Sequence, residues 1–113
     1  LPVWDKPSFA CLGSRFPVGT RVTEDRVVRV QRVESALRLM GFLQFRARWH
    51  ELDGEPMVRL ELDADGLQRA TEPNLREAIV DVCKAEGFVW VTLDLKGYRS
   101  GSLSIARTNS AIA

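Results

Sequence analysis

The chain has 113 residues, 45% of them hydrophobic, which is enough for one domain with a core of its own. Sixteen lysines and arginines nearly balance 15 acidic residues, so no overall positive field favours nucleic acid or an anionic membrane. Two cysteines do not form a disulfide framework, and a cytoplasmic location is the simpler expectation. We find no membrane-spanning apolar run and no signal peptide, and we expect no membrane partner.

Residues 1–22 predict a cysteine-bearing loop and linker, because residues 6–23 have no apolar period and contain Pro and Gly. Cys11 lies in this loop with cations on both sides of it in the sequence, Lys6 before it and Arg15 and Arg21 after it. Nearby positive charge lowers the pKa of a thiol and favours the reactive thiolate. A half-buried structural cysteine beside a turn is the alternative that spacing leaves open.

A helix is predicted over residues 23–40. Thr23 is a good N-cap, and the two acidic residues that follow it suit the first turn. An apolar stripe follows at helical spacing, formed by Val30, Val33, Leu37 and Met40. Gly41 stands where a left-handed residue ends a helix.

Residues 42–50 alternate between apolar and polar and predict a strand, with Leu43, Phe45, Ala47 and Trp49 facing the core. The Asp53-Gly54 pair predicts a hairpin turn. With this turn, Trp49 pairs with Val58, Ala47 with Leu60 and Phe45 with Leu62 on the core face. The opposite face pairs Arg48 with Arg59 and Arg46 with Glu61.

Residues 63–71 predict a link with a short helical turn, and a second helix begins near Glu72 and ends at Gly87. Leu75, Ile79 and Val82 form its apolar stripe, and Cys83 is a small core residue. Residues 88–96 predict a third strand, with an inward set (Val89, Val91, Leu93 and Leu95) and an outward set (Trp90, Thr92, Asp94 and Lys96).

The predicted fold is a two-layer α-β-β-α-β domain over residues 23–102, of class α+β, with a three-stranded, mainly antiparallel sheet. Both helices lead into a strand through a Gly-Phe corner, so both are expected on one side of the sheet. The other face is then uncovered, and it carries Arg46, Arg48, Arg59, Trp90 and Asp94. Residues 103–113 predict a tail that is partly disordered.

Two groups of residues on or near this open face suit an anion. Arg46 and Arg48 are two positions apart on one strand, so their forks point the same way about 7 Å apart, a spacing that suits phosphate. The alternative is a solvated face with an Arg46–Glu61 ion pair. Arg99 and Ser100 lie in a predicted turn after the last strand. Together with backbone N–H groups they could bind an anion there, and a plain polar turn is the alternative.

The single histidine, His50, has no second histidine or carboxylate at the spacing of metal ligands. Asp63, Asp65 and Asp94 are candidate Mg²⁺ ligands, but a role in a turn or at a strand end explains each of them equally well. We therefore name no metal ligand.

Three motifs follow one another in the chain: KPSFACLGSRFPVGT (6–20), GFLQFRARWH (41–50) and VTLDLKGYRSGS (91–102). Together they resemble ATP-dependent sacrificial sulfur transferases, the LarE family of the PP-loop superfamily, over most of residues 4–102. The Ser-Gly-Gly-x-Asp-Ser phosphate loop of that superfamily is not in this sequence, nor is a Walker A loop. The resemblance therefore implies a C-terminal portion only, with ATP and Mg²⁺ bound mainly by an N-terminal domain.

The resemblance also implies a reaction, in which a carboxylate of a pyridinium biscarboxylate mononucleotide is adenylated on the route to the nickel-pincer cofactor. Cys11 attacks as a thiolate and finally loses its sulfur, and Ser14, Arg46 and Arg48 occupy positions that resemble phosphate ligands. A homo-oligomer is expected. One loop cysteine with a distant Cys83 argues against an iron–sulfur cluster. Trp49 departs from a His-His pair at 49–50, which removes any role of the first histidine.

Three other functions stay open. The C-terminal domain of a tRNA-thiolating PP-loop enzyme would need a second catalytic cysteine, for which Cys83 is badly placed. The open face could bind RNA, but the RRM and KH motifs are absent, and we do not expect nucleic acid as a partner. A non-catalytic oligomerisation module is the third.

Overall fold

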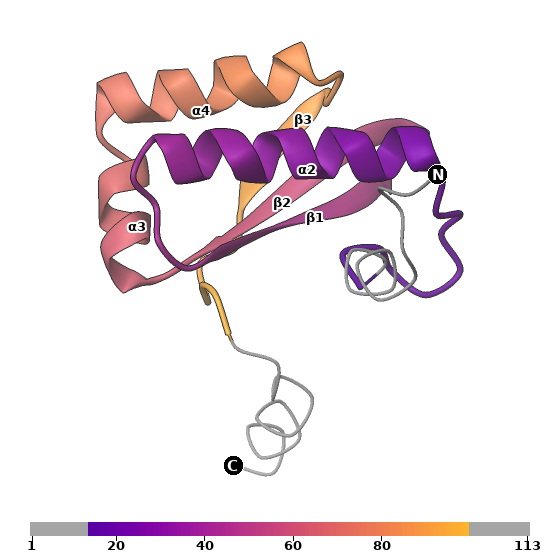
Figure 1. The fold of residues 1–113 in the computed structure, drawn as a ribbon, viewed down its shortest axis with the longest axis horizontal. Coiled ribbons are helices and arrows are strands. Elements are labelled where there is room, and N and C mark those ends of the chain that lie inside the picture. The colour runs from indigo at the N-terminus through magenta and orange to yellow at the C-terminus, as the bar shows by residue number, and fades with distance from the viewer. Residues whose placement is uncertain (1–13, 100–113) are drawn as a thin grey trace, which may run out of the picture.

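The computed structural model describes residues 14–99 (Figure 1). The elements are α2 (Glu24–Leu39), β1 (Phe45–Leu52), β2 (Glu55–Leu62), α3 (Ala64–Ala70), α4 (Pro73–Ala85) and β3 (Trp90–Leu93). This order confirms the α+β class, and α3 occupies the predicted link. The predictions for Cys11, Ser100 and the tail lie outside the described residues. Among the described helices, none combines the length and the apolar character needed to cross a membrane.

Both long helices end in the same type of turn, a Gly-Phe corner. After α2, Gly41 has φ +96° and its N–H donates to Arg38 O, while the Phe42 N–H donates to Leu37 O. These two hydrogen bonds form a Schellman motif. The motif places Phe42, the residue after the glycine, in the core, where it is 2% exposed. The end of α4 repeats the pattern at Gly87 and Phe88. As predicted, both helices lie on one side of the sheet (Figure 1).

The sheet has the order β1-β2-β3. Strands β1 and β2 are antiparallel in the predicted register, with Trp49 opposite Val58 and Arg48 opposite Arg59. Strand β3 runs parallel to β2, because α3 and α4 carry the chain back across the sheet before β3 begins. The sheet is therefore mixed, with one antiparallel and one parallel pairing, where the sequence predicted a mainly antiparallel one.

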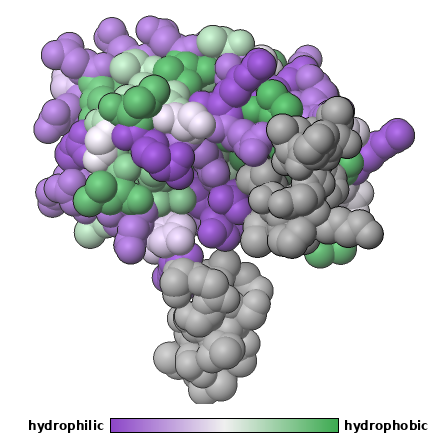
Figure 2. Space-filling model, viewed as in Figure 1, coloured by the Kyte–Doolittle hydropathy of each residue, from purple (hydrophilic) through white to green (hydrophobic). Residues whose placement is uncertain are grey.

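The core lies between the helices and the sheet. Trp49 belongs to this core, with its ring 5.8 Å from Phe16 and 5.3 Å from Phe88, centroid to centroid. Cys83 is confirmed as a core residue, 1% exposed, and burial, followed by the Glu86 charge, raises the pKa of its thiol to about 12. The surface on the side of α2 and α4 is largely hydrophilic, with scattered hydrophobic residues between (Figure 2).

Three residues predicted to face the core do not. Leu43 and Leu95 are each 85% exposed, and Val89 is 46% exposed. The strands are shorter than the alternating pattern suggested, so these residues lie in the connections before β1 and around β3. Alternation that runs past the end of a strand into a turn no longer fixes which way a side chain points.

Candidate anion-binding site

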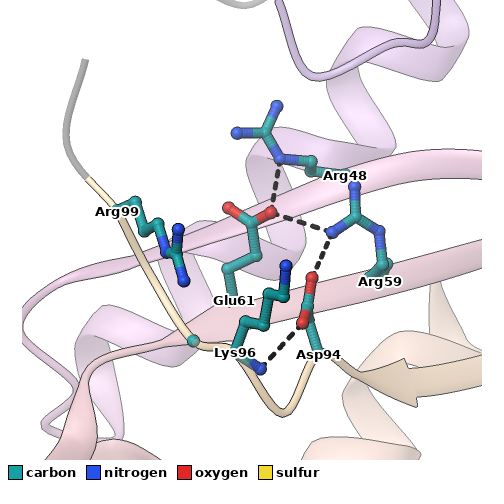
Figure 3. Close-up of a pocket in the computed structure, with 7 residues that line it drawn as sticks. Arg48, Arg59, Glu61, Asp94, Lys96 and Arg99 are labelled. Carbon is teal, nitrogen blue, oxygen red and sulfur yellow. Dashed lines mark hydrogen bonds and ion pairs between the residues drawn. The ribbon is translucent and has the colours of Figure 1, made fainter. Parts of the chain in front are cut away.

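The sheet face opposite the helices is polar and carries charges from all three strands. Arg48 on β1 lies directly across from Arg59 on β2, and Asp94 follows the end of β3 (Figure 3). The alternation of β1 and β2 sends these side chains away from the core, because their neighbours Trp49 and Val58 point into it. The two layers of the fold thus leave a charged face open.

A buried carboxylate joins the two arginines. Glu61 is 5% exposed, and it accepts bonds from Arg48 Nε at 2.8 Å and Arg59 Nη1 at 2.9 Å. Arg59 Nη1 also donates to Asp94 Oδ2 at 2.6 Å. Charge-assisted bonds of this length are strong and directional, so both guanidiniums are held in fixed orientations.

Arg46 does not take part in this network. The predicted register places it opposite Glu61, but the carboxylate binds Arg48 and Arg59 instead. Arg46 Nε is buried without a hydrogen-bond partner among the described residues, and the guanidinium carbon lies 5.7 Å from the centroid of the Tyr98 ring. Arg46 and Arg48 therefore share a strand face but do not line the same hollow.

A hollow of about 270 Å³ opens between the arginines and the turn after β3 (Figure 3). Four cationic side chains and two carboxylates line it, together with one glycine: Arg48, Arg59, Lys96, Arg99, Glu61, Asp94 and Gly97. The excess of cations makes the hollow attractive to a small anion.

A second hollow of about 160 Å³ lies on the other side of the same arginine pair, where the N-terminal segment crosses β1. Arg48 Nη1 donates to the Ser14 carbonyl at 3.0 Å, and the Trp49 N–H donates to the Arg15 carbonyl at 2.9 Å. These bonds fix the segment along the edge of β1 that β2 does not cover. Arg48 therefore belongs to both hollows.

Glu34 on α2 holds this segment from the core side. It is 7% exposed, accepts two bonds of 3.1 Å from Arg15, and accepts a third of 2.9 Å from the Ala47 N–H. Arg15, which the sequence placed among the cations near the thiol, therefore forms a structural link. Glu34 itself was missed, although a sequence signal existed: it falls on the apolar stripe of α2, four residues after Val30.

His50 lies at the edge of the site as a hydrogen-bond acceptor. Its Nε2 accepts from Arg59 Nε at 3.1 Å, which requires the neutral ring. Burial, followed by the charges of Arg59 and Arg48, lowers the pKa of His50 below its usual 6.5, so the ring is neutral near neutral pH. Within residues 14–99, no group of three His, Cys, Asp or Glu side chains could hold a metal ion.

The structure brings together three of the six predicted site residues. Ser14, Arg48 and Arg99 lie around the hollows, Arg46 points toward Tyr98, and Cys11 and Ser100 lie outside the described residues. The sequence also placed Arg59 on the open face without assigning it to the site, and it missed Lys96 as a lining residue.

Comparisons with known proteins point the same way as the motifs. The chain matches no protein-family profile. It is 34% identical over 113 residues to the pyridinium-3,5-bisthiocarboxylic acid mononucleotide synthase of Lactiplantibacillus plantarum, and 39% identical over 104 residues to an uncharacterized protein of Synechocystis sp.. These alignments cover 100% and 92% of this chain, but only 39% and 37% of the two relatives. The chain is thus related to a synthase of this kind and spans less than two-fifths of its length.

Proposed function

We propose that this chain is the C-terminal part of a LarE-like, ATP-dependent sulfur transferase, which gives the sulfur of its own Cys11 to a pyridinium carboxylate mononucleotide. Support comes from the similarity to a synthase whose name specifies a bisthiocarboxylic acid mononucleotide, along the whole of this chain. The cationic face supplies what such a substrate needs, because its phosphate and carboxylates are all anions.

The observation that carries the proposal is the bond from Arg48 Nη1 to the Ser14 carbonyl. Ser14 follows Cys11 by three residues, and three extended residues span at most about 11 Å. The backbone that leads to the thiol is therefore tied to Arg48, which lines both hollows together with Arg59. A substrate bound there would have its reacting carboxyl group within reach of the cysteine-bearing segment.

The proposed reaction has three steps. ATP adenylates the substrate carboxylate and releases pyrophosphate. The Cys11 thiolate then attacks the activated carbonyl, a carbon–sulfur bond forms, and AMP leaves. A base removes the Cys11 α-proton, the Cβ–S bond breaks, and the products are a thiocarboxylate and a dehydroalanine at position 11. The sequence of steps needs no external oxidant or reductant, because the elimination is redox-neutral overall.

Different parts of the protein are proposed to bind the different reactants. Ser14 and Arg48 are proposed to hold a phosphate of the nucleotide, and Arg46, whose guanidinium lies over the Tyr98 ring and outside both hollows, would join them after a change of rotamer. The turn with Arg99 and Ser100 is proposed to bind an anion. ATP and Mg²⁺ are proposed to bind mainly to an N-terminal domain outside this chain, and the assembly to be a homo-oligomer. No iron–sulfur cluster enters the proposed reaction.

Intact mass spectrometry tests the proposal on the full-length protein, after incubation with ATP, Mg²⁺ and pyridinium-3,5-biscarboxylic acid mononucleotide. We expect the protein to lose the elements of one H₂S, and peptide mapping to place dehydroalanine at position 11. Cys11→Ser should abolish the loss, and Arg48→Gln should slow it. Formation of thiocarboxylate with Cys11 intact would contradict the proposal.

A further inference from the structure

The hollow beneath the turn at residues 94–99 contains two cations that no carboxylate neutralises. Within residues 14–99, neither the Lys96 ammonium nor the Arg99 guanidinium forms an ion pair or a side-chain hydrogen bond. Both side chains lie beside the network of Arg48, Glu61 and Arg59 in Figure 3. Unpaired cations that share one hollow repel each other, and a bound anion would relieve this repulsion.

The two carboxylates in the hollow are occupied. Glu61 binds both Arg48 and Arg59, and Asp94 binds Arg59 through one oxygen and the Lys96 backbone N–H, at 2.9 Å, through the other. Their negative charge is therefore matched by the two arginines, and the remaining charge of the hollow is that of Lys96 and Arg99. Two positive charges are balanced by a dianion.

The turn that carries these cations is fixed to the sheet. The Asp94 N–H donates to Leu60 O at 2.8 Å, and the Tyr98 N–H donates to Leu62 O at 2.8 Å. Gly97 has φ +85°, and a Cβ at this position would lie 2.8 Å from Leu62 O. Only glycine allows the turn to approach β2 this closely, so the backbone positions of Lys96 and Arg99 at the border of the hollow are set before any ligand binds.

We infer that this hollow is an anion subsite in its own right, in which Arg59, Lys96 and Arg99 bind a small dianion. A phosphate monoester and an aromatic dicarboxylate share the required charge. The subsite lies on the side of the Arg48–Arg59 pair away from Ser14, so it is distinct from the hollow beside the cysteine-bearing segment. The inference rests on contacts of residues 14–99 alone, and it holds whether or not Cys11 gives up its sulfur.

Heteronuclear NMR of the 113-residue chain tests the inference, with ribose 5-phosphate and pyridine-3,5-dicarboxylate as separate probes at constant ionic strength. At least one probe should shift the backbone amides of Lys96 and Gly97 and the Nε–H signals of Arg59 and Arg99. Nitrate, a monoanion, should shift them much less. The probe that binds more tightly identifies the chemistry of the ligand.

Lys96→Gln and Arg99→Gln should each weaken binding of that probe about fivefold, which is the scale of one partly exposed ionic contact. The matched controls are Lys84→Gln and Arg76→Gln, which remove the same charges from exposed positions on α4 and should leave the affinity unchanged. The spectrum of each variant reports whether it is folded. Absence of binding by both probes, shifts confined to the Ser14 side, or equal losses in the control variants would each overturn the inference.

Discussion

Replacing Glu34 should destabilise the domain far more than replacing a surface carboxylate. The ion pair between Glu34 and Arg15 is largely buried, with side-chain exposures of 9% and 14%, and Glu34 also accepts the Ala47 N–H. Glu34→Ala removes all three bonds and takes away the buried carboxylate that accepts from both the Arg15 guanidinium and the Ala47 N–H. Removing one partner of a buried pair costs about 3–5 kcal/mol, which is a large part of the stability of a domain this size.

Urea unfolding followed by tryptophan fluorescence measures this cost, because Trp49 lies beside the segment that Glu34 holds. Glu34→Gln keeps one acceptor oxygen and should cost less, about 1.5–3 kcal/mol. The control is Glu51→Gln, which breaks an ion pair with Arg26 whose side chains are 42% and 27% exposed and should cost under about 1 kcal/mol.

The same variants report on the anion site. Because Glu34 positions Arg15, and Arg15 is adjacent to the Ser14 carbonyl that Arg48 binds, Glu34→Gln should also weaken ligand binding on the Ser14 side.

The unfolding measurements can refute the stability prediction. A free energy of unfolding for Glu34→Ala within about 0.5 kcal/mol of that for Glu51→Gln would do so, because it would mean that the buried pair contributes no more than an exposed one.

Three further predictions concern single residues. The pKa of His50 is below its unfolded value of 6.5, so the unfolded state binds more protons; stability should fall as pH drops below about 6.5, and His50→Gln should reduce that slope in pH-dependent urea titrations. Burial raises the pKa of Cys83 to about 12, so its thiol should resist iodoacetamide until urea unfolds the chain; peptide mapping separates it from Cys11, and labelling of Cys83 itself in the native state would contradict its burial. Gly97→Ala should cost about 1–3 kcal/mol more than Gly54→Ala in thermal unfolding, because both have positive φ but only Gly97 faces a backbone oxygen; equal costs would exclude the clash.

Much of the fold could be predicted because several local signals agreed. The Asp53-Gly54 turn and the alternation of β1 and β2 specify one register, and the structure has that register. The two Gly-Phe corners likewise predicted which side of the sheet the helices cover. Where only alternation was available, as at Leu43 and Leu95, the prediction ran past the strand ends and was wrong.

The site was harder to predict, because its network depends on side-chain direction across strands. Sequence spacing indicated that Arg46 and Arg48 share a face, but it could not show that Glu61 would bind Arg48 and Arg59 and not its direct neighbour Arg46. Diagonal contacts of this kind are set by rotamers and by sheet twist. Lys96 was assigned only to the outward face, because the turn that brings it to the hollow depends on the φ of Gly97.

The two ends of the described chain meet at one pair of guanidiniums. Ser14 approaches Arg48 from one side, and the turn that ends at Arg99 borders the same hollow as Arg48 and Arg59 from the other. A ligand that contacted both hollows would connect two segments that are 85 residues apart in sequence. Occupancy of this face would then slow the local opening of both segments together, so that they exchange their amide protons as one unit.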